Sequence, residues 1–105
     1  MNITVHQDPS GAIRLHLAGD LDLGTAELLG GEVRAALAEF RPETLVVDAG
    51  ELGFCDSAGI HALLSARRDA HRGGSGFQVT NLHGRSLRAL EVTGVLAGLT
   101  TLSRP

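Results

Sequence analysis

The chain has 105 residues, of which 43% are hydrophobic, so it is long enough for one domain with one core and too apolar to be disordered. Its formal net charge of −3 provides no basic surplus for nucleic acid or an anionic membrane, and no apolar run approaches the roughly 20 residues that span a bilayer. A single cysteine, Cys55, excludes an internal disulfide, and residues 1–20 lack the pattern of a signal peptide, so we expect a cytoplasmic protein.

Two strands are predicted near the N-terminus, at residues 3–7 and 12–18, with a turn between them. In the second strand apolar residues occur at every second position from Ile13, which indicates that one face is buried. His16 lies at an intervening position, so we expect it on the other face, near solvent.

A loop rich in glycine and aspartate at residues 19–24 precedes a helix predicted over residues 25–40. The helix has an apolar residue every three or four positions, and Thr25 is a suitable N-cap. The Gly30-Gly31 pair is unfavourable inside a helix by about 1 kcal/mol per residue relative to alanine. Close packing of this helix against the sheet would explain the pair.

A third strand is predicted at residues 44–48, and its consecutive apolar residues are typical of a strand covered on both faces. A second helix is predicted over residues 57–72, and the Gly-Gly-Ser-Gly segment after it ends the helix. A fourth strand at 77–82 and a third helix at 85–93 follow. The apolar tail at 95–102 fits either a strand or a helical turn.

The order of these elements, ββαβαβα, predicts an α/β fold with a mixed β-sheet of four to five strands and helices packed on it. No repeat, linker or low-complexity segment interrupts the sequence. We therefore expect residues 1–105 to form a single domain.

An Asp-Ser pair, Asp56-Ser57, stands where the second helix begins. The unpaired N–H groups and the dipole of a helix N-terminus favour negative charge, so a phosphate on the Ser57 hydroxyl would be tolerated there. Aspartate and serine are also common N-caps, and the spacing alone favours a simple cap. The two interpretations are compatible, because Asp56 can cap the helix while Ser57 accepts a phosphate.

Two segments of the chain carry a family resemblance. They are Gly19-Asp20-Leu21-Asp22 with Thr25-Ala26, and Phe54-Cys55-Asp56-Ser57-Ala58-Gly59-Ile60. Together they resemble the signature of the STAS domain, and in particular that of the bacterial anti-anti-sigma factors, which are anti-sigma factor antagonists. The resemblance covers nearly the whole chain and implies one STAS domain over residues 1–105.

The resemblance implies partner switching in transcription regulation. In this family the serine directly after the aspartate, Ser57 here, is phosphorylated by an anti-sigma factor that is also a serine kinase. The unphosphorylated protein binds the anti-sigma factor, which then releases its sigma factor, and the phosphorylated protein does not bind. Position 58 is often Ser or Thr in the family and is Ala58 here, which leaves one hydroxyl for the kinase and for a phosphatase acting on Ser57.

The partner-binding residues that we expect come from both segments. They are Asp20, Asp22, Thr25, Asp56, Ser57, Gly59 and Ile60. The first three lie on the loop before the first helix, and the others build the start of the second helix. We expect no cofactor, because the ATP belongs to the partner kinase.

Other chemistry has weaker support in the sequence. Asp20 and Asp22 are too few carboxylates to define a Ca²⁺ or Mg²⁺ site, and such residues more often shape turns, so we assign no metal. Cys55 lies where a small buried residue is expected, which favours packing over a role as nucleophile. No motif combines a nucleophile, a base and an orienting acid, so we expect that the protein is not an enzyme.

The alternative function is a STAS subunit of a transporter or scaffold assembly that works without a phospho-switch. The intact pair Asp56-Ser57 favours the switch. The neighbouring genes discriminate between the two, because an anti-sigma kinase gene would support the switch and transporter genes would support the alternative.

Overall fold

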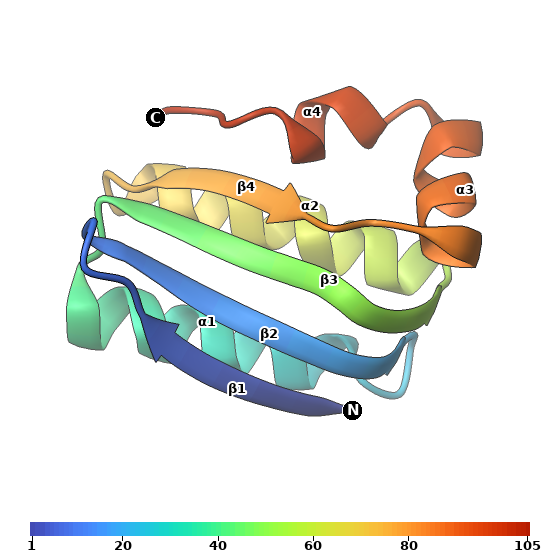
Figure 1. Cartoon of the computed structure of the whole chain (residues 1–105), viewed down its shortest axis with the longest axis horizontal. Coiled ribbons are helices and arrows are strands. Elements are labelled where there is room, and N and C mark those ends of the chain that lie inside the picture. Colours follow the sequence, from blue (N-terminus) through green and yellow to red (C-terminus); the bar gives the residue numbers. More distant parts are fainter.

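Four strands form one mixed sheet in the computed structural model, which describes residues 1–105 (Figure 1). The strands lie in the order β1-β2-β3-β4, with β1 antiparallel to β2 and with β2, β3 and β4 parallel. The elements in chain order are β1 (Asn2–Gln7), β2 (Ala12–Leu21), α1 (Ala26–Phe40), β3 (Thr44–Cys55), α2 (Ser57–Arg72), β4 (Gly76–Thr80), α3 (Gly84–Thr93) and α4 (Leu96–Thr100).

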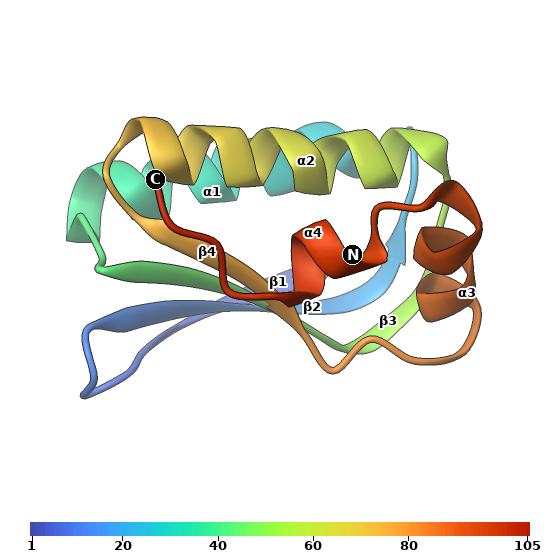
Figure 2. The ribbon, with the colours of Figure 1, turned by 90° about the horizontal axis from the view of Figure 1, so that it is seen from above.

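The two crossover helices lie on the same face of the sheet. Figure 2 shows α1 and α2 as one layer above the strands, with α3 at one end of the molecule. Each crossover joins two neighbouring parallel strands, and crossovers of one hand put successive helices on one face when the strand order advances in one direction. The predicted α/β fold with a mixed sheet of four to five strands is therefore confirmed, and the sheet has four strands. None of the helices combines the length and the apolar character needed to cross a membrane.

One hydrophobic core fills the space between the sheet and the helices. The alternation predicted in β2 is confirmed, because Ile13, Leu15 and Leu17 are all buried there. Every helix contributes to the same core. The helical core residues are Leu29, Val33, Ala36, Ile60, Leu63, Ala66, Ala70, Leu90 and Leu99. A core shared by the sheet and all four helices makes one α/β unit.

The second face of the sheet carries neither α1 nor α2, which corrects the prediction that β3 is covered on both faces (Figure 2). Val46 of β3 is nevertheless only 7% exposed. Its partners in the sheet register are Arg14 of β2 and Gln78 of β4. Val46 is therefore buried on a face that neither of the two crossover helices covers.

A polar cluster on this uncovered face includes His16, which is half-buried rather than solvated. Its Nδ1 lies 3.4 Å from Asp48 Oδ2 and its Nε2 lies 3.5 Å from Glu51 Oε1. Asp48 Oδ1 also accepts hydrogen bonds from Asn81 Nδ2 at 3.0 Å and from the Gly50 N–H at 2.9 Å. Burial alone would raise the pKa of Asp48, but these hydrogen bonds and His16 outweigh it and lower the pKa below its ordinary value.

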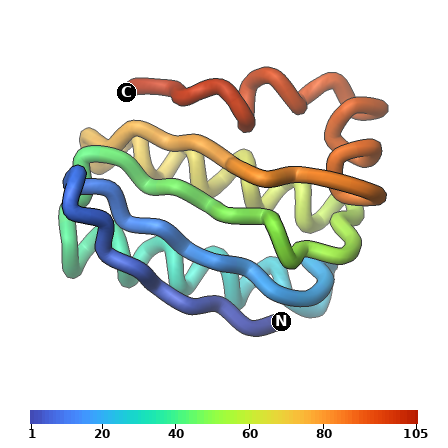
Figure 3. The backbone as a smooth tube through the Cα atoms, viewed as in Figure 1, coloured from blue at the N-terminus to red at the C-terminus, as the bar shows by residue number.

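β2, β3 and the C-terminal tail differ from their predicted boundaries. β2 continues to Leu21, so Gly19 and the candidate site residue Asp20, which the sequence predicts in a loop, lie in the strand. β3 continues beyond residue 48 as far as Cys55, because the long β2 goes on pairing with it up to the Leu21–Cys55 partners. The tail first forms the short helix α4 and then one antiparallel bridge between Ser103 and Phe77. Figure 3 shows this tail returning alongside β4. Within residues 95–102 the helical interpretation is the correct one, because the bridge at Ser103 lies just beyond that range.

The glycine pair in α1 is not explained by packing against the sheet. A Cβ at Gly30 would lie 3.1 Å from Nη1 of Arg34 on the same helix, and a Cβ at Gly31 would meet no atom within 4 Å. The explanation offered from the sequence is therefore wrong, and nothing in the structure requires glycine at position 31.

Candidate functional site

Helix α2 begins at a capped residue. Asp56 has extended backbone angles, and its Oδ1 accepts a hydrogen bond from the Gly59 N–H at 2.9 Å. The Asp56 N–H donates to the Leu21 carbonyl oxygen at 3.2 Å, which ties the start of α2 to the end of β2. Asp56 is therefore the N-cap, and its side chain supports the fold.

Gly59 allows the first turn of α2 to pack directly on β2. A Cβ at this position would collide with the Leu21 carbonyl oxygen and would lie 2.8 Å from Cys55 Sγ. Both Gly59 and its neighbour Ile60 are buried. These two predicted site residues therefore build the start of the helix and present little surface.

Ser57 is the exposed first residue of α2. The hydrogen bonds at this helix start are made by Asp56 and Cys55, and the Ser57 hydroxyl makes none within the chain. The N–H groups of the first turn have no carbonyl partner inside the helix, which leaves donors for an anion. No contact that holds the fold together depends on the Ser57 hydroxyl.

The loop before α1 lies at the same end of the sheet as the start of α2, on the right of Figure 1. β2 and β3 are parallel, and Leu21 at the end of β2 pairs with Cys55 at the end of β3. The segments that follow two neighbouring parallel strands emerge at the same edge, where α/β proteins usually bind their ligands. The structure thus brings together the two segments that carry the predicted site.

Asp22 and Thr25 shape this loop. Thr25 Oγ1 donates to the Asp20 carbonyl oxygen at 2.8 Å and accepts a hydrogen bond from the Asp22 N–H at 2.9 Å. Asp22 Oδ1 accepts a hydrogen bond from the Thr25 N–H at 3.1 Å. Thr25 stands at the N-cap position of α1, but its hydroxyl bonds into the loop instead of capping the helix. The Asp20 side chain is exposed.

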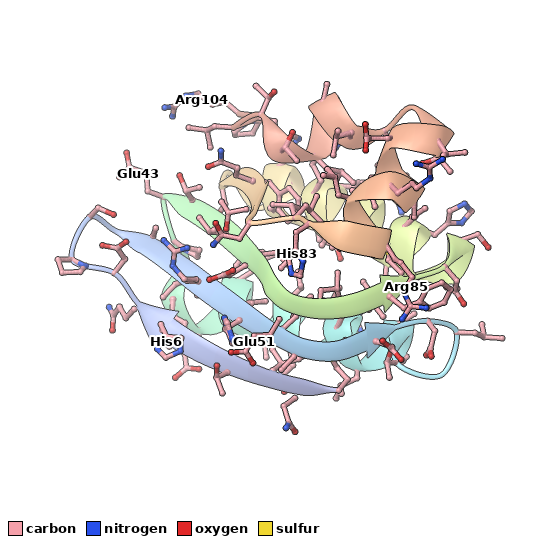
Figure 4. All side chains as sticks on the ribbon, turned by 45° about the vertical axis from the view of Figure 1, so that its right-hand side comes forward. His6, Glu43, Glu51, His83, Arg85 and Arg104 are labelled. Carbon is pink, nitrogen blue, oxygen red and sulfur yellow. The ribbon has the colours of Figure 1, made fainter.

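A hollow of about 350 Å³ opens between the start of α2 and helix α3. Ser57 lines one side, and Arg85, Arg88 and Val92 line the other. The Arg85 guanidinium also lies over the ring of Phe54, 5.7 Å from its centroid. Figure 4 shows Arg85 at the end of the molecule where β2 and β3 finish.

Arg85 and Arg88 were not predicted as site residues from the sequence. They lie far from Ser57 in the chain, and only the folded structure places α3 beside the start of α2. One signal was present in the sequence. Residues three apart in a helix share a face, so the spacing of the two arginines predicts that their charges lie together once α3 forms.

Large apolar side chains are exposed at this end of the molecule. Leu23 in the loop before α1 is 80% exposed, Val92 on α3 is 77% exposed, and Phe54 at the end of β3 is 38% exposed. Exposed apolar groups with a polar surround are typical of protein interaction surfaces. This end of the molecule therefore combines exposed apolar contact area with the exposed Ser57 hydroxyl.

Cys55 is 1% exposed and belongs to the hydrophobic core. Burial, together with the neighbouring charge of Asp56, raises the pKa of the Cys55 thiol to about 11. A thiol with this pKa stays protonated at neutral pH and is a poor nucleophile. The structure supports the packing role that the sequence favours.

Solved structures with the same fold cover most of the chain. An anti-sigma factor antagonist from Mycobacterium paratuberculosis is 23% identical, with a TM-score of 0.80 over 93% of this chain and 81% of that one. A sulfate transporter family protein from Wolinella succinogenes is 22% identical, with a TM-score of 0.72 over 87% of this chain and 73% of that one. The Bacillus cell fate determinant SpoIIAA in its phosphorylated form is 19% identical, with a TM-score of 0.62 over 95% of this chain and 89% of that one. At these identities the likeness establishes the fold alone.

No curated protein sequence is significantly similar to the chain. The family model described as "Mlab, STAS domain" matches residues 5–101, which is nearly the whole sequence. Both segments that carry the sequence resemblance, from Gly19 to Ala26 and from Phe54 to Ile60, lie inside the match. The chain therefore belongs to the STAS domain family.

Proposed function

We propose that this STAS domain is an anti-sigma factor antagonist that phosphorylation of Ser57 switches off. The unphosphorylated chain binds an anti-sigma factor with serine kinase activity, which then releases its sigma factor. A phosphatase that acts on Ser57 restores binding. The observation that carries the proposal is the exposed and unbonded Ser57 hydroxyl at a helix start that Asp56 already caps.

The phosphorylation step needs nothing from this chain except the hydroxyl. The bond between the γ-phosphorus of ATP and its bridging oxygen breaks, and a bond to Ser57 Oγ forms. ADP leaves, and the hydroxyl proton goes to a base of the kinase or to water. Because the chain supplies the acceptor while the partner supplies ATP and the catalytic groups, we propose a binding module that needs no cofactor.

The fold should tolerate the phosphate, whereas a bound partner should not. The modification adds about −1.5 to −2 charge at neutral pH and interrupts no hydrogen bond of the fold. The same charge lies at a hollow that the exposed side chain of Val92 also lines, and a partner closing over this surface would have to desolvate it. A penalty of about 4 kcal/mol would lower affinity roughly a thousandfold.

Incubation with ATP and the candidate anti-sigma kinase, followed by intact mass and peptide mapping, tests this proposal. We expect one added phosphate, located on Ser57, and none in Ser57→Ala. Ser10→Ala is the matched control, because Ser10 is an exposed serine in the β1–β2 turn. A phosphate at another residue, or none with an active kinase, would overturn the proposal.

The same fold also occurs in a sulfate transporter family protein, so the rival function is a subunit of a transporter or scaffold assembly. In that case Ser57→Ala and wild type should behave alike in every binding assay, and the partner should have no kinase activity. Affinity capture with both proteins from the native cell extract distinguishes the two functions, because only the switch predicts an anti-sigma factor as partner.

A further inference from the structure

Arg85 and Arg88 on α3 have no acidic partner in the chain. The arginines that form salt bridges are Arg14 with Asp48 and Arg34 with Glu27. Neither Arg85 nor Arg88 donates a hydrogen bond, and both side chains are exposed. Like charges one helical turn apart repel each other, so an anion bound between the two would relieve that repulsion.

The hollow beside α3 brings these two charges to the residue that we propose as the phosphate acceptor. Arg85, Arg88 and Ser57 all line it. Asp56 lines it too, with one carboxylate oxygen held by the Gly59 N–H. A phosphate on Ser57 would therefore lie beside an existing carboxylate, and two guanidinium groups across the hollow would offset that negative charge.

Guanidinium groups are well suited to a phosphate monoester. Arginine presents planar pairs of N–H donors that match phosphate oxygens and that stay charged at every relevant pH. The ring of Phe54 under Arg85 restrains that side chain at the rim of the hollow, which lowers the entropic cost of binding. The cluster thus has the charge, the donors and the space that a phosphoryl group requires.

We propose that Arg85 and Arg88 bind the phosphate of phosphorylated Ser57 and form an intramolecular phosphoserine site. This inference rests on the proposed function in one respect, that Ser57 carries the phosphate. It adds a second effect to the switch. Phosphorylation places a charged group in the hollow and removes two free cations from the surface around Ser57. An acidic group on the partner would then lose its contacts with these arginines.

Phosphoserine installed at position 57 during translation makes the test independent of any kinase. The ³¹P NMR shift is followed through a pH titration, since the second ionisation of phosphoserine has a pKa of about 6 and nearby arginines lower it. We expect the Arg85→Gln/Arg88→Gln double variant to titrate roughly one pH unit above the wild-type phosphoprotein. Each single variant should fall between them.

The matched control is Arg68→Gln/Arg72→Gln, which removes the same charge from the last turns of α2, remote from Ser57. The phosphoserine of this control should have the same pKa as that of the wild-type phosphoprotein. Coincident titrations of wild type and the Arg85→Gln/Arg88→Gln variant would overturn the proposal, as would an equal shift in the control.

Amide NMR spectra of the unphosphorylated variants check that the fold is kept. If the kinase does not phosphorylate Ser57, the proposed function is wrong. The titration of the installed phosphoserine tests the arginine site independently of that outcome.

Discussion

Asp56 and Ser57 are neighbours at the start of α2, but only Asp56 contributes a hydrogen bond to the fold. The cap satisfies a backbone donor of the first turn and leaves the serine hydroxyl free in solvent. This division of roles allows one position to be modified without loss of the helix. It also predicts that the two residues differ in their contribution to stability.

Asp56→Ala should lower the free energy of unfolding by about 1 kcal/mol, because it removes the cap. Ser57→Ala should change it by less than about 0.5 kcal/mol, since the hydroxyl has no partner in the fold. Urea unfolding monitored by circular dichroism measures both. Equal losses in the two variants would show that Ser57 is part of the cap.

Asp48 on the uncovered face of the sheet should make stability depend on pH. Its pKa is lowered in the folded state, so its contribution is fully present above the unfolded pKa of about 3.9 and is lost as the pH falls through the folded pKa. Asp48→Asn should be less stable than wild type at neutral pH and should lose less on acidification. Urea midpoints between about pH 6 and about pH 3 measure this, and parallel curves for the two proteins would refute it.

For single residues, the sequence predicts those roles that depend on residues nearby in the chain. The Asp56 cap and the packing of Cys55 follow from local patterns, and both agree with the structure. The arginines of the hollow could not be found in this way. Arg85 is far from Ser57 in the sequence, and only the docking of α3 beside α2 brings the two to one hollow.

The helices and strands were predictable where hydrophobic periodicity is strong and uninterrupted. α2 agrees with its prediction at both ends, because Asp56 begins it and a glycine ends it. β3 does not, since Gly50 and Gly53 resemble a loop in the sequence. They are accommodated because β2 pairs along that stretch, and Asp20 packs where a side chain on Gly53 would project.

Two glycine substitutions test the packing of the helices. Gly31→Ala should stabilise the protein by about 0.5–1 kcal/mol, because position 31 lies inside α1 with open space around a new Cβ. Gly59→Ala should destabilise it by about 1–3 kcal/mol, because the methyl group would meet the backbone of Leu21. Thermal unfolding of both variants gives the signs, and stabilisation by Gly59→Ala would contradict the packing of α2 on β2.

In the molecule as a whole, parallel pairing of β2 and β3 puts the loop after β2 and the start of α2 at one end. Parallel neighbours that are joined by helices finish at the same edge, so this arrangement follows once β2 and β3 are known to pair. The position of the tail was not predictable, because its bridge to Phe77 depends on an edge of β4 that no local pattern reveals. The candidate site therefore depends on how the strands are ordered and paired, and no single helix or strand forms it alone.

We propose that phosphate on Ser57 prevents partner binding while the fold is kept. Isothermal titration of the anti-sigma factor with the unmodified chain and with the chain carrying phosphoserine at position 57 measures the effect directly. We expect the modified chain to bind roughly a thousandfold more weakly, a loss of about 4 kcal/mol, with an unchanged circular dichroism spectrum. Equal affinities for the two forms would show that phosphate on Ser57 does not control partner binding.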